Sequence, residues 1–109
     1  MEYKTLFIKE NHFKVNGIQY NEKSFALSFY KFIKDVLDKK YGDLPKEEKM
    51  NIIFKSIVYL KMEDIPKTTI EKKAYKTLGD VYVNVNTGTE VKKRQIEKIC
   101  TELNLNYTL

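Results

Sequence analysis

The stretch VYVNVNTGTEVKKRQIEKIC, residues 81–100, predicts a strand, a polar turn and a helix in direct succession. In residues 81–85 the three valines fall on one side of the strand, and Tyr82 and Asn84 fall on the other. Four residues of the helix share one face at the i, i+3, i+4, i+7 spacing of a buried stripe: Ile96, Ile99, Cys100 and Leu103. We therefore expect both elements to face one core, with Cys100 as a small buried hydrophobe rather than a reactive thiol.

The turn between this strand and this helix matches a capping box, with Thr87 and Glu90 at the required spacing. In such a box the two side chains satisfy free N–H groups at the start of the helix. Opposite charges also stand four residues apart, Glu90 with Arg94 and Lys98 with Glu102, which predicts ion pairs on a solvated face. The favoured interpretation is that the turn only caps the helix.

A second interpretation is that the same turn binds a phosphate, because a helix N-terminus offers N–H groups and a favourable dipole. Five residues would form that site: Thr87, Gly88, Thr89, Lys92 and Lys93. Glu90 lies in the first turn and would repel an anion, so the capping interpretation is preferred. It predicts that alanine at Lys92 or Lys93 changes stability little.

Two elements precede this stretch near the start of the chain. Residues 3–9 are rich in β-forming residues, and Asn16-Gly17 between two short alternating runs predicts a hairpin with a type I′ turn. The larger side chains of this hairpin are Phe13, Val15, Ile18 and Tyr20. Ser24 then predicts the cap of a helix that Gly42 ends with a left-handed turn. One face of that helix is apolar: Phe25, Phe29, Phe32, Ile33 and Val36.

The middle of the chain is less decided. Pro45 suits the first position of a second helix, which residues 46–54 continue. Helix and strand both remain open for residues 52–60 and for residues 68–78. Residues 106–109 predict a short closing strand. The fold class is therefore α+β: a single domain over residues 1–109, with an N-terminal hairpin and two to three helices packed on one face of a small, mostly antiparallel sheet.

Composition limits the function. The formal charge is +5, but Arg94 is the only arginine among twenty basic residues, which is unusual for a dedicated reader of phosphate or guanine. The single cysteine fits a reducing compartment. Neither a secretory signal nor an apolar run of membrane-spanning length is present, so we expect a cytoplasmic protein without membrane contact.

Catalytic and metal-binding patterns are weak. Asp64 followed by Glu71-Lys72-Lys73 has the residue types of a divalent-metal nuclease, but such a motif normally lies on an apolar strand and this segment is mostly charged. His12 is the only histidine and has no partner nearby in sequence, which predicts a surface position. The four glycines form no phosphate-binding loop. We therefore expect no enzymatic activity, no metal site and no cofactor.

The Lys-rich segment 67–76 is the best nucleic-acid candidate, because its lysines alternate with threonines and Tyr75. With the helix start at 92–93, six residues are predicted to contact nucleic acid: Lys67, Lys72, Lys73, Lys76, Lys92 and Lys93. An edge strand that uses lysine against unwanted pairing would explain the same pattern. The alternative is a module that binds a larger protein through exposed aromatics: Tyr59, Tyr75 and Tyr82.

The order of landmarks resembles a small α/β module found alone or at the ends of bacterial restriction-associated proteins. The landmarks are Asn16-Gly17, the helix start at Ser24-Phe25, Tyr82-Val83 with Asn86 ahead of a helix, and a short final strand. The module commonly has Trp where this chain has Phe25, and Ser after the Asn turn, where Gly88 and Thr89 stand here. The resemblance implies a DNA-handling or anti-phage setting in a bacterium, phage or mobile element, without a catalytic residue to carry over. In the protein-binding alternative, the chain would be a phage-encoded inhibitor or an accessory subunit.

Overall fold

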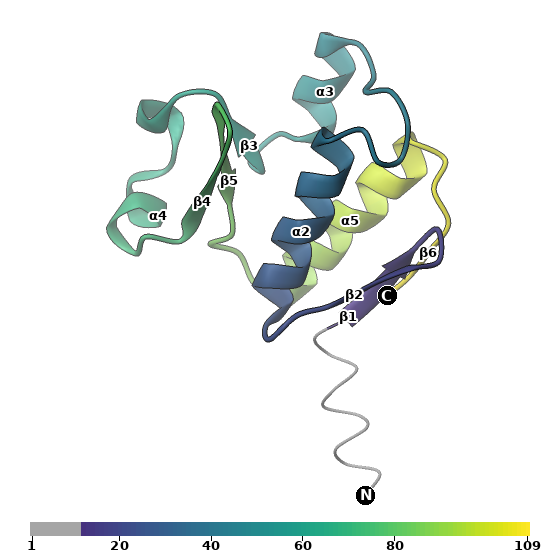
Figure 1. Ribbon diagram of the computed structural model, residues 1–109. Coiled ribbons are helices and arrows are strands. Elements are labelled where there is room, and N and C mark those ends of the chain that lie inside the picture. Colours follow the sequence, from purple (N-terminus) through teal and green to yellow (C-terminus); the bar gives the residue numbers. More distant parts are fainter. Residues whose placement is uncertain (1–11) are drawn as a thin grey trace, which may run out of the picture.

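The computed structural model describes residues 12–109, and it is an α+β domain with two small antiparallel sheets. Two helices, α2 (Phe25–Leu37) and α5 (Thr89–Glu102), lie between those sheets (Figure 1). The single sheet predicted from sequence is therefore wrong in this respect, because the helices separate the strands into two groups of three. The predicted strand at residues 3–9 and the side chain of His12 lie outside the described part. No helix within residues 12–109 is long and apolar enough to cross a membrane.

The first sheet contains the predicted hairpin. Strands β1 (His12–Val15) and β2 (Ile18–Asn21) pair antiparallel, and β6 (Tyr107–Thr108) pairs with the other edge of β1, which confirms the closing strand. Asn16 and Gly17 adopt φ values of 48° and 82°, as a type I′ turn requires. The Asn16 side chain accepts a hydrogen bond from the amide of Asn106 at 2.8 Å, so this turn also holds the C-terminal segment.

Helix α2 begins as predicted. The Ser24 hydroxyl accepts a hydrogen bond from the amide of Leu27 at 3.2 Å. The five predicted apolar residues of this helix are all buried in the core. The end of the helix differs, because α2 stops at Leu37 and the left-handed residue that follows its cap is Lys39, with φ 63°. Gly42, with φ 110°, ends the next turn instead, where its amide donates to the carbonyl of Lys39.

Both undecided segments divide into a helix and a strand. In the first, α3 (Glu47–Ile53) ends and β3 (Val58–Tyr59) follows after a turn; the N-cap is Lys46, so Pro45 lies before the helix and not at its first position. In the second, α4 (Lys67–Glu71) precedes β4 (Tyr75–Leu78), after a 3-10 turn, η1 (Met62–Asp64). In each segment the β-rich second half pairs with another strand, and this tertiary pairing separates it from the helical first half.

The second sheet has the order β3-β5-β4, with β5 (Val81–Asn84) in the centre. Val83 is fully buried on the side that faces the helices. Asn84, on the opposite side, is also buried, and its side chain donates to the carbonyl of Ser56 at 3.3 Å and accepts from the amide of Asn86 at 2.8 Å. A buried amide in this position is therefore satisfied by local main chain.

The buried stripe of α5 is confirmed, with Ile96, Ile99 and Cys100 each fully buried and Leu103 partly buried against the core. Burial raises the pKa of the Cys100 thiol from 9.0 to about 12. The thiol is therefore protonated and inaccessible in the folded protein at neutral pH.

Cys100→Ser is expected to lower the free energy of unfolding by about 1–3 kcal/mol, because a hydroxyl would lie on the apolar stripe. The native thiol should react with an aromatic disulfide reagent only after unfolding. Because its folded pKa lies above its unfolded pKa, the wild type should lose stability relative to Cys100→Ala as the pH rises above 9. Urea unfolding at pH 8 and pH 10 measures the loss of stability and its pH dependence. Immediate labelling of the thiol in the folded protein would contradict the burial of Cys100.

Candidate nucleic-acid interface

The capping box predicted at the start of α5 does not form. The N-cap residue is Gly88, and no side chain caps the helix. Thr87 lies one residue too early, and its hydroxyl is buried without a hydrogen-bond partner in the described structure. Glu90 is exposed, and its carboxylate lies 3.8 Å from the ammonium of Lys93. The prediction was wrong because a capping box requires its Thr at the N-cap itself.

The two i, i+4 ion pairs predicted along α5 are also absent within residues 12–109, where other partners take their place. Arg94 donates to the main-chain carbonyl of Glu90 at 3.5 Å. Lys98 donates to the carbonyl of Ile52 at 3.2 Å, and Glu102 lies 3.3 Å from Lys49. Both of these last contacts join α5 to α3, so tertiary neighbours replace the predicted partners along the helix.

Lys92 is a structural residue. Only 3% of its surface is exposed, and its ammonium donates to the carbonyl of Val85 at 3.0 Å and to that of Thr87. The nitrogen also lies 5.9 Å from the centroid of the Phe29 ring. Burial lowers its pKa from the usual 10.5. Lys92 is therefore withdrawn from the predicted phosphate site and from the predicted nucleic-acid surface. Its position four residues before Ile96, on the buried stripe, is the sequence signal that was missed.

The lysines of segment 67–76 lie on and around α4 and β4. Lys67, Lys72 and Lys73 are exposed, and Lys76 is half-buried. No carboxylate of the described chain lies within ion-pair distance of these four ammonium groups. We call these four residues the lysine cluster. Lys93, by contrast, is half-buried on α5 and faces Glu90, so it is not counted in the cluster.

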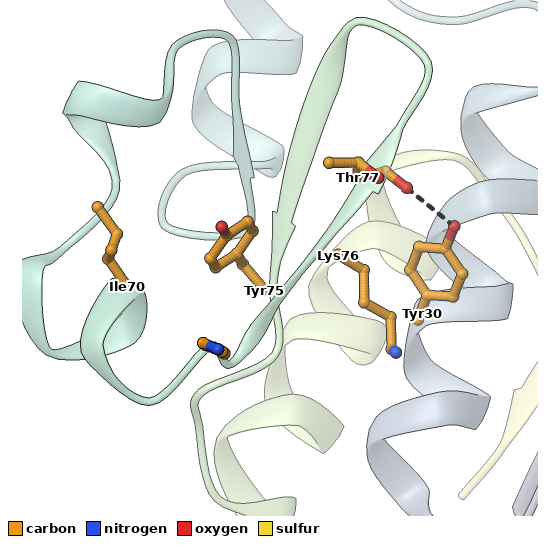
Figure 2. Close-up of a pocket in the computed structure, with 6 residues that line it drawn as sticks. Tyr30, Ile70, Tyr75, Lys76 and Thr77 are labelled. Carbon is orange, nitrogen blue, oxygen red and sulfur yellow. Dashed lines mark hydrogen bonds between the residues drawn. The ribbon is translucent and has the colours of Figure 1, made fainter.

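A groove of about 640 Å³ runs beside β4 (Figure 2). Its lining comes from α2, from β4 and from α4 with the turn that follows: Tyr30, Ile70, Lys73, Tyr75, Lys76 and Thr77. The Lys76 ammonium lies 5.7 Å from the centroid of the Tyr30 ring, and the Tyr30 hydroxyl donates to the carbonyl of Thr77 at 3.3 Å. Lys76 and Tyr30 lie on the side of β4 that faces α2, whereas Tyr75 and Ile70 lie on its other side (Figure 2). The groove therefore follows the edge of β4, with one aromatic ring on each side and Lys73 and Lys76 in its lining. Tyr30 was missed from sequence because it precedes Thr77 by 47 residues, and no local pattern connects them.

The three tyrosines of the protein-binding alternative share one face of the second sheet. Tyr59 pairs with Tyr82, and Tyr82 pairs with Thr77, two residues from Tyr75. The rings of Tyr75 and Tyr82 meet edge to face, with centroids 6.2 Å apart. All three side chains are half-buried, and Figure 2 shows Tyr75 turned toward Ile70 of α4. The register therefore brings the three together, but without forming an exposed aromatic patch.

The acidic residues of the nuclease pattern lie outside strands. Asp64 is the last residue of η1, and Glu71 is the last residue of α4. Within residues 12–109, no group of three or more His, Cys, Asp or Glu side chains is placed to hold a metal ion. The strand that a Glu-x-Lys nuclease motif needs is therefore replaced by a short helix at this position.

Comparison of the chain with protein-family models, curated proteins and solved structures finds no match. The argument for function therefore rests on the geometry of the groove and the lysine cluster.

Proposed function

We propose that this protein is a non-enzymatic binding module that contacts nucleic acid through the lysine cluster beside β4. The observation that carries the proposal is the local charge: segment 67–76 has four lysines and a single acid, Glu71, and those lysines have no carboxylate partner in the described chain. Other described lysines, such as Lys14 and Lys46, also have no carboxylate within ion-pair distance, so the proposal rests on the concentration of four such lysines within ten residues. Unpaired ammonium groups bind phosphates and release the counterions condensed on them.

The proposed setting is DNA handling in a bacterium, phage or mobile element. The resemblance to the restriction-associated module supports this setting, because its local landmarks have the expected conformations here. Asn16-Gly17 forms the tight turn, Ser24 caps a helix, and Asn86 precedes α5. The resemblance brings no catalytic residue, which accords with a binding role.

The second candidate is a protein-binding module that uses the tyrosine face. The observation that favours it is the shared register of Tyr59, Tyr75 and Tyr82. Interface anchors are normally exposed in the free protein and become buried on binding. Because these three rings are already half-buried, the lysine cluster supports nucleic-acid binding more strongly.

The double variant Lys72→Ala/Lys73→Ala is expected to bind a labelled oligonucleotide more weakly and with less dependence on salt. Each lost phosphate contact should reduce the slope of log K against log salt by about 0.7 to 0.9, so the double variant should lose about one to two units. Fluorescence anisotropy over a series of salt concentrations measures the slope.

A matched control removes two lysines away from the groove, Lys14→Ala/Lys46→Ala. Lys14 lies on β1 in the other sheet, and Lys46 precedes α3, so the net charge changes equally at distant places (Figure 1). The control should retain the wild-type slope. Equal slopes for the two double variants would show that binding follows net charge alone, and the lysine cluster would then lose its assignment.

A further inference from the structure

The shape of the groove distinguishes between forms of nucleic acid. Tyr30 of α2 lines one wall and Ile70 of α4 the other, with β4 between them (Figure 2). Proteins that read a duplex insert a protruding helix or strand ribbon into one of its grooves. The site here is a hollow of about 640 Å³ that lies open along the edge of β4, and a flexible single strand can follow such a surface. The shape therefore favours an unpaired strand.

The strand β4 has an open edge that faces this groove. It is the last strand in the order β3-β5-β4, and the amide of Val85 donates to the carbonyl of Ala74 at 2.9 Å. In an antiparallel ladder the following positions, Tyr75 and Thr77, then belong to non-hydrogen-bonded pairs, so their main-chain groups point away from β5. The bond from the Tyr30 hydroxyl to the carbonyl of Thr77 agrees with this direction.

The same bond argues against a peptide as the occupant. An added β-strand would need the outward carbonyl of Thr77 for its ladder, and Tyr30 already donates to that carbonyl. A nucleobase needs only one or two donors or acceptors at its edge. The main-chain groups of Tyr75 and the amide of Thr77, which point away from β5, can supply them.

The side chains provide the other two contacts that a single strand needs. Lys73 and Lys76 line the groove with ammonium groups that can bind phosphates. The Tyr75 ring is held edge to face against Tyr82, at an interplanar angle of 69°, and it also lines the groove. A base can stack on such a ring only when it is not stacked in a duplex.

We infer that the groove binds single-stranded nucleic acid, with phosphates at Lys73 and Lys76 and a base against Tyr75. This inference rests on the proposed function and adds to it the strandedness of the ligand and the ring that selects it. The other lysines of the cluster, Lys67 and Lys72, contribute charge at the edge of the same surface.

The test compares labelled oligothymidylate with a duplex of equal phosphate number, at one salt concentration. The wild type should bind the single strand at least about tenfold more tightly than the duplex. Tyr75→Leu should lower the single-strand affinity about tenfold and leave duplex binding unchanged, because leucine keeps an apolar side chain at this position but has no ring face. Tyr75→Phe should retain single-strand binding. Circular dichroism and thermal unfolding establish that each variant is folded.

Equal affinity for the two ligands, with Tyr75→Leu binding as the wild type does, would overturn the inference. A reduced salt slope in Lys72→Ala/Lys73→Ala would then leave the proposed function standing. Absence of binding to either oligonucleotide would overturn both. Salt-dependent binding of poly-glutamate as tightly as oligothymidylate would assign the groove to an acidic protein and would also overturn the inference.

Discussion

Phe32→Ala is expected to lower the free energy of unfolding by about 3–5 kcal/mol, a large part of the total stability of a small domain. The Phe32 ring is fully buried, and it joins the hairpin to α2. Its edge-to-face contacts reach Phe13 and Tyr20, each with centroids 5.8 Å apart, and the ring of Tyr41 lies at 6.1 Å. Alanine would leave a cavity between rings that α2 and the first sheet hold in place.

Chemical denaturation with two probes, far-ultraviolet circular dichroism and tyrosine fluorescence, measures this loss. The matched control is Ile52→Ala, because Ile52 is 61% exposed on α3 and its truncation should cost less than about 1 kcal/mol. Similar losses for the two variants would contradict the central position of Phe32. A loss large enough to unfold Phe32→Ala at room temperature would support that central position. The milder variant Phe32→Leu would then give a measurable change in the free energy of unfolding.

Lys92→Ala is expected to cost about 2–4 kcal/mol, because two main-chain carbonyls lose their donor and the side chain leaves a gap over Phe29. Lys92→Met keeps most of the aliphatic volume. The difference in stability between Lys92→Ala and Lys92→Met therefore measures the contribution of packing, and the difference between Lys92→Met and the wild type measures the contribution of the ammonium group. Lys93→Ala should change stability by less than about 0.5 kcal/mol, because the half-buried Lys93 side chain has only the exposed carboxylate of Glu90 as its ion-pair partner.

The pH dependence of Lys92 follows from its lowered pKa. Because the folded pKa lies below 10.5, the unfolded chain holds this proton more tightly than the folded chain does. The wild type should therefore gain stability relative to Lys92→Met as the pH rises from neutral toward 10.5. Equal losses for Lys92→Ala and Lys93→Ala, or a wild type that loses stability relative to Lys92→Met over this range, would contradict the buried position.

Features that depend on interactions between residues only a few positions apart were predictable from the sequence. The turn at Asn16-Gly17 depends on the positive φ angles of two adjacent residues, and the cap at Ser24 depends on an amide three residues away. The buried faces of α2 and α5 follow from helical periodicity, which is a local property of the chain. The α+β class, the hairpin, the closing strand and the burial of Cys100 were therefore correct.

The capping box failed locally, because Gly88 rather than Thr87 is the N-cap, but other features that failed depend on contacts with distant segments. Residues 68–78 have the composition of either a helix or a strand, and pairing with β5 selects the strand for only the second part. Lys92 lies on the buried stripe by its spacing from Ile96, but its contact with the Phe29 ring of α2 appears only in the fold. The groove likewise exists only because α2 places Tyr30 beside Thr77, 47 residues further along the chain.

The sequence alone thus determined the local elements, the buried stripes and the concentration of lysines in segment 67–76. The tertiary structure alone decided that two sheets form rather than one, and that Lys73, Lys76 and Tyr75 line one groove along the edge of β4. The physical reason is the range of the interactions. Periodicity and turn geometry act over a few residues, whereas burial and charge pairing depend on which segments, far apart in sequence, the core brings together.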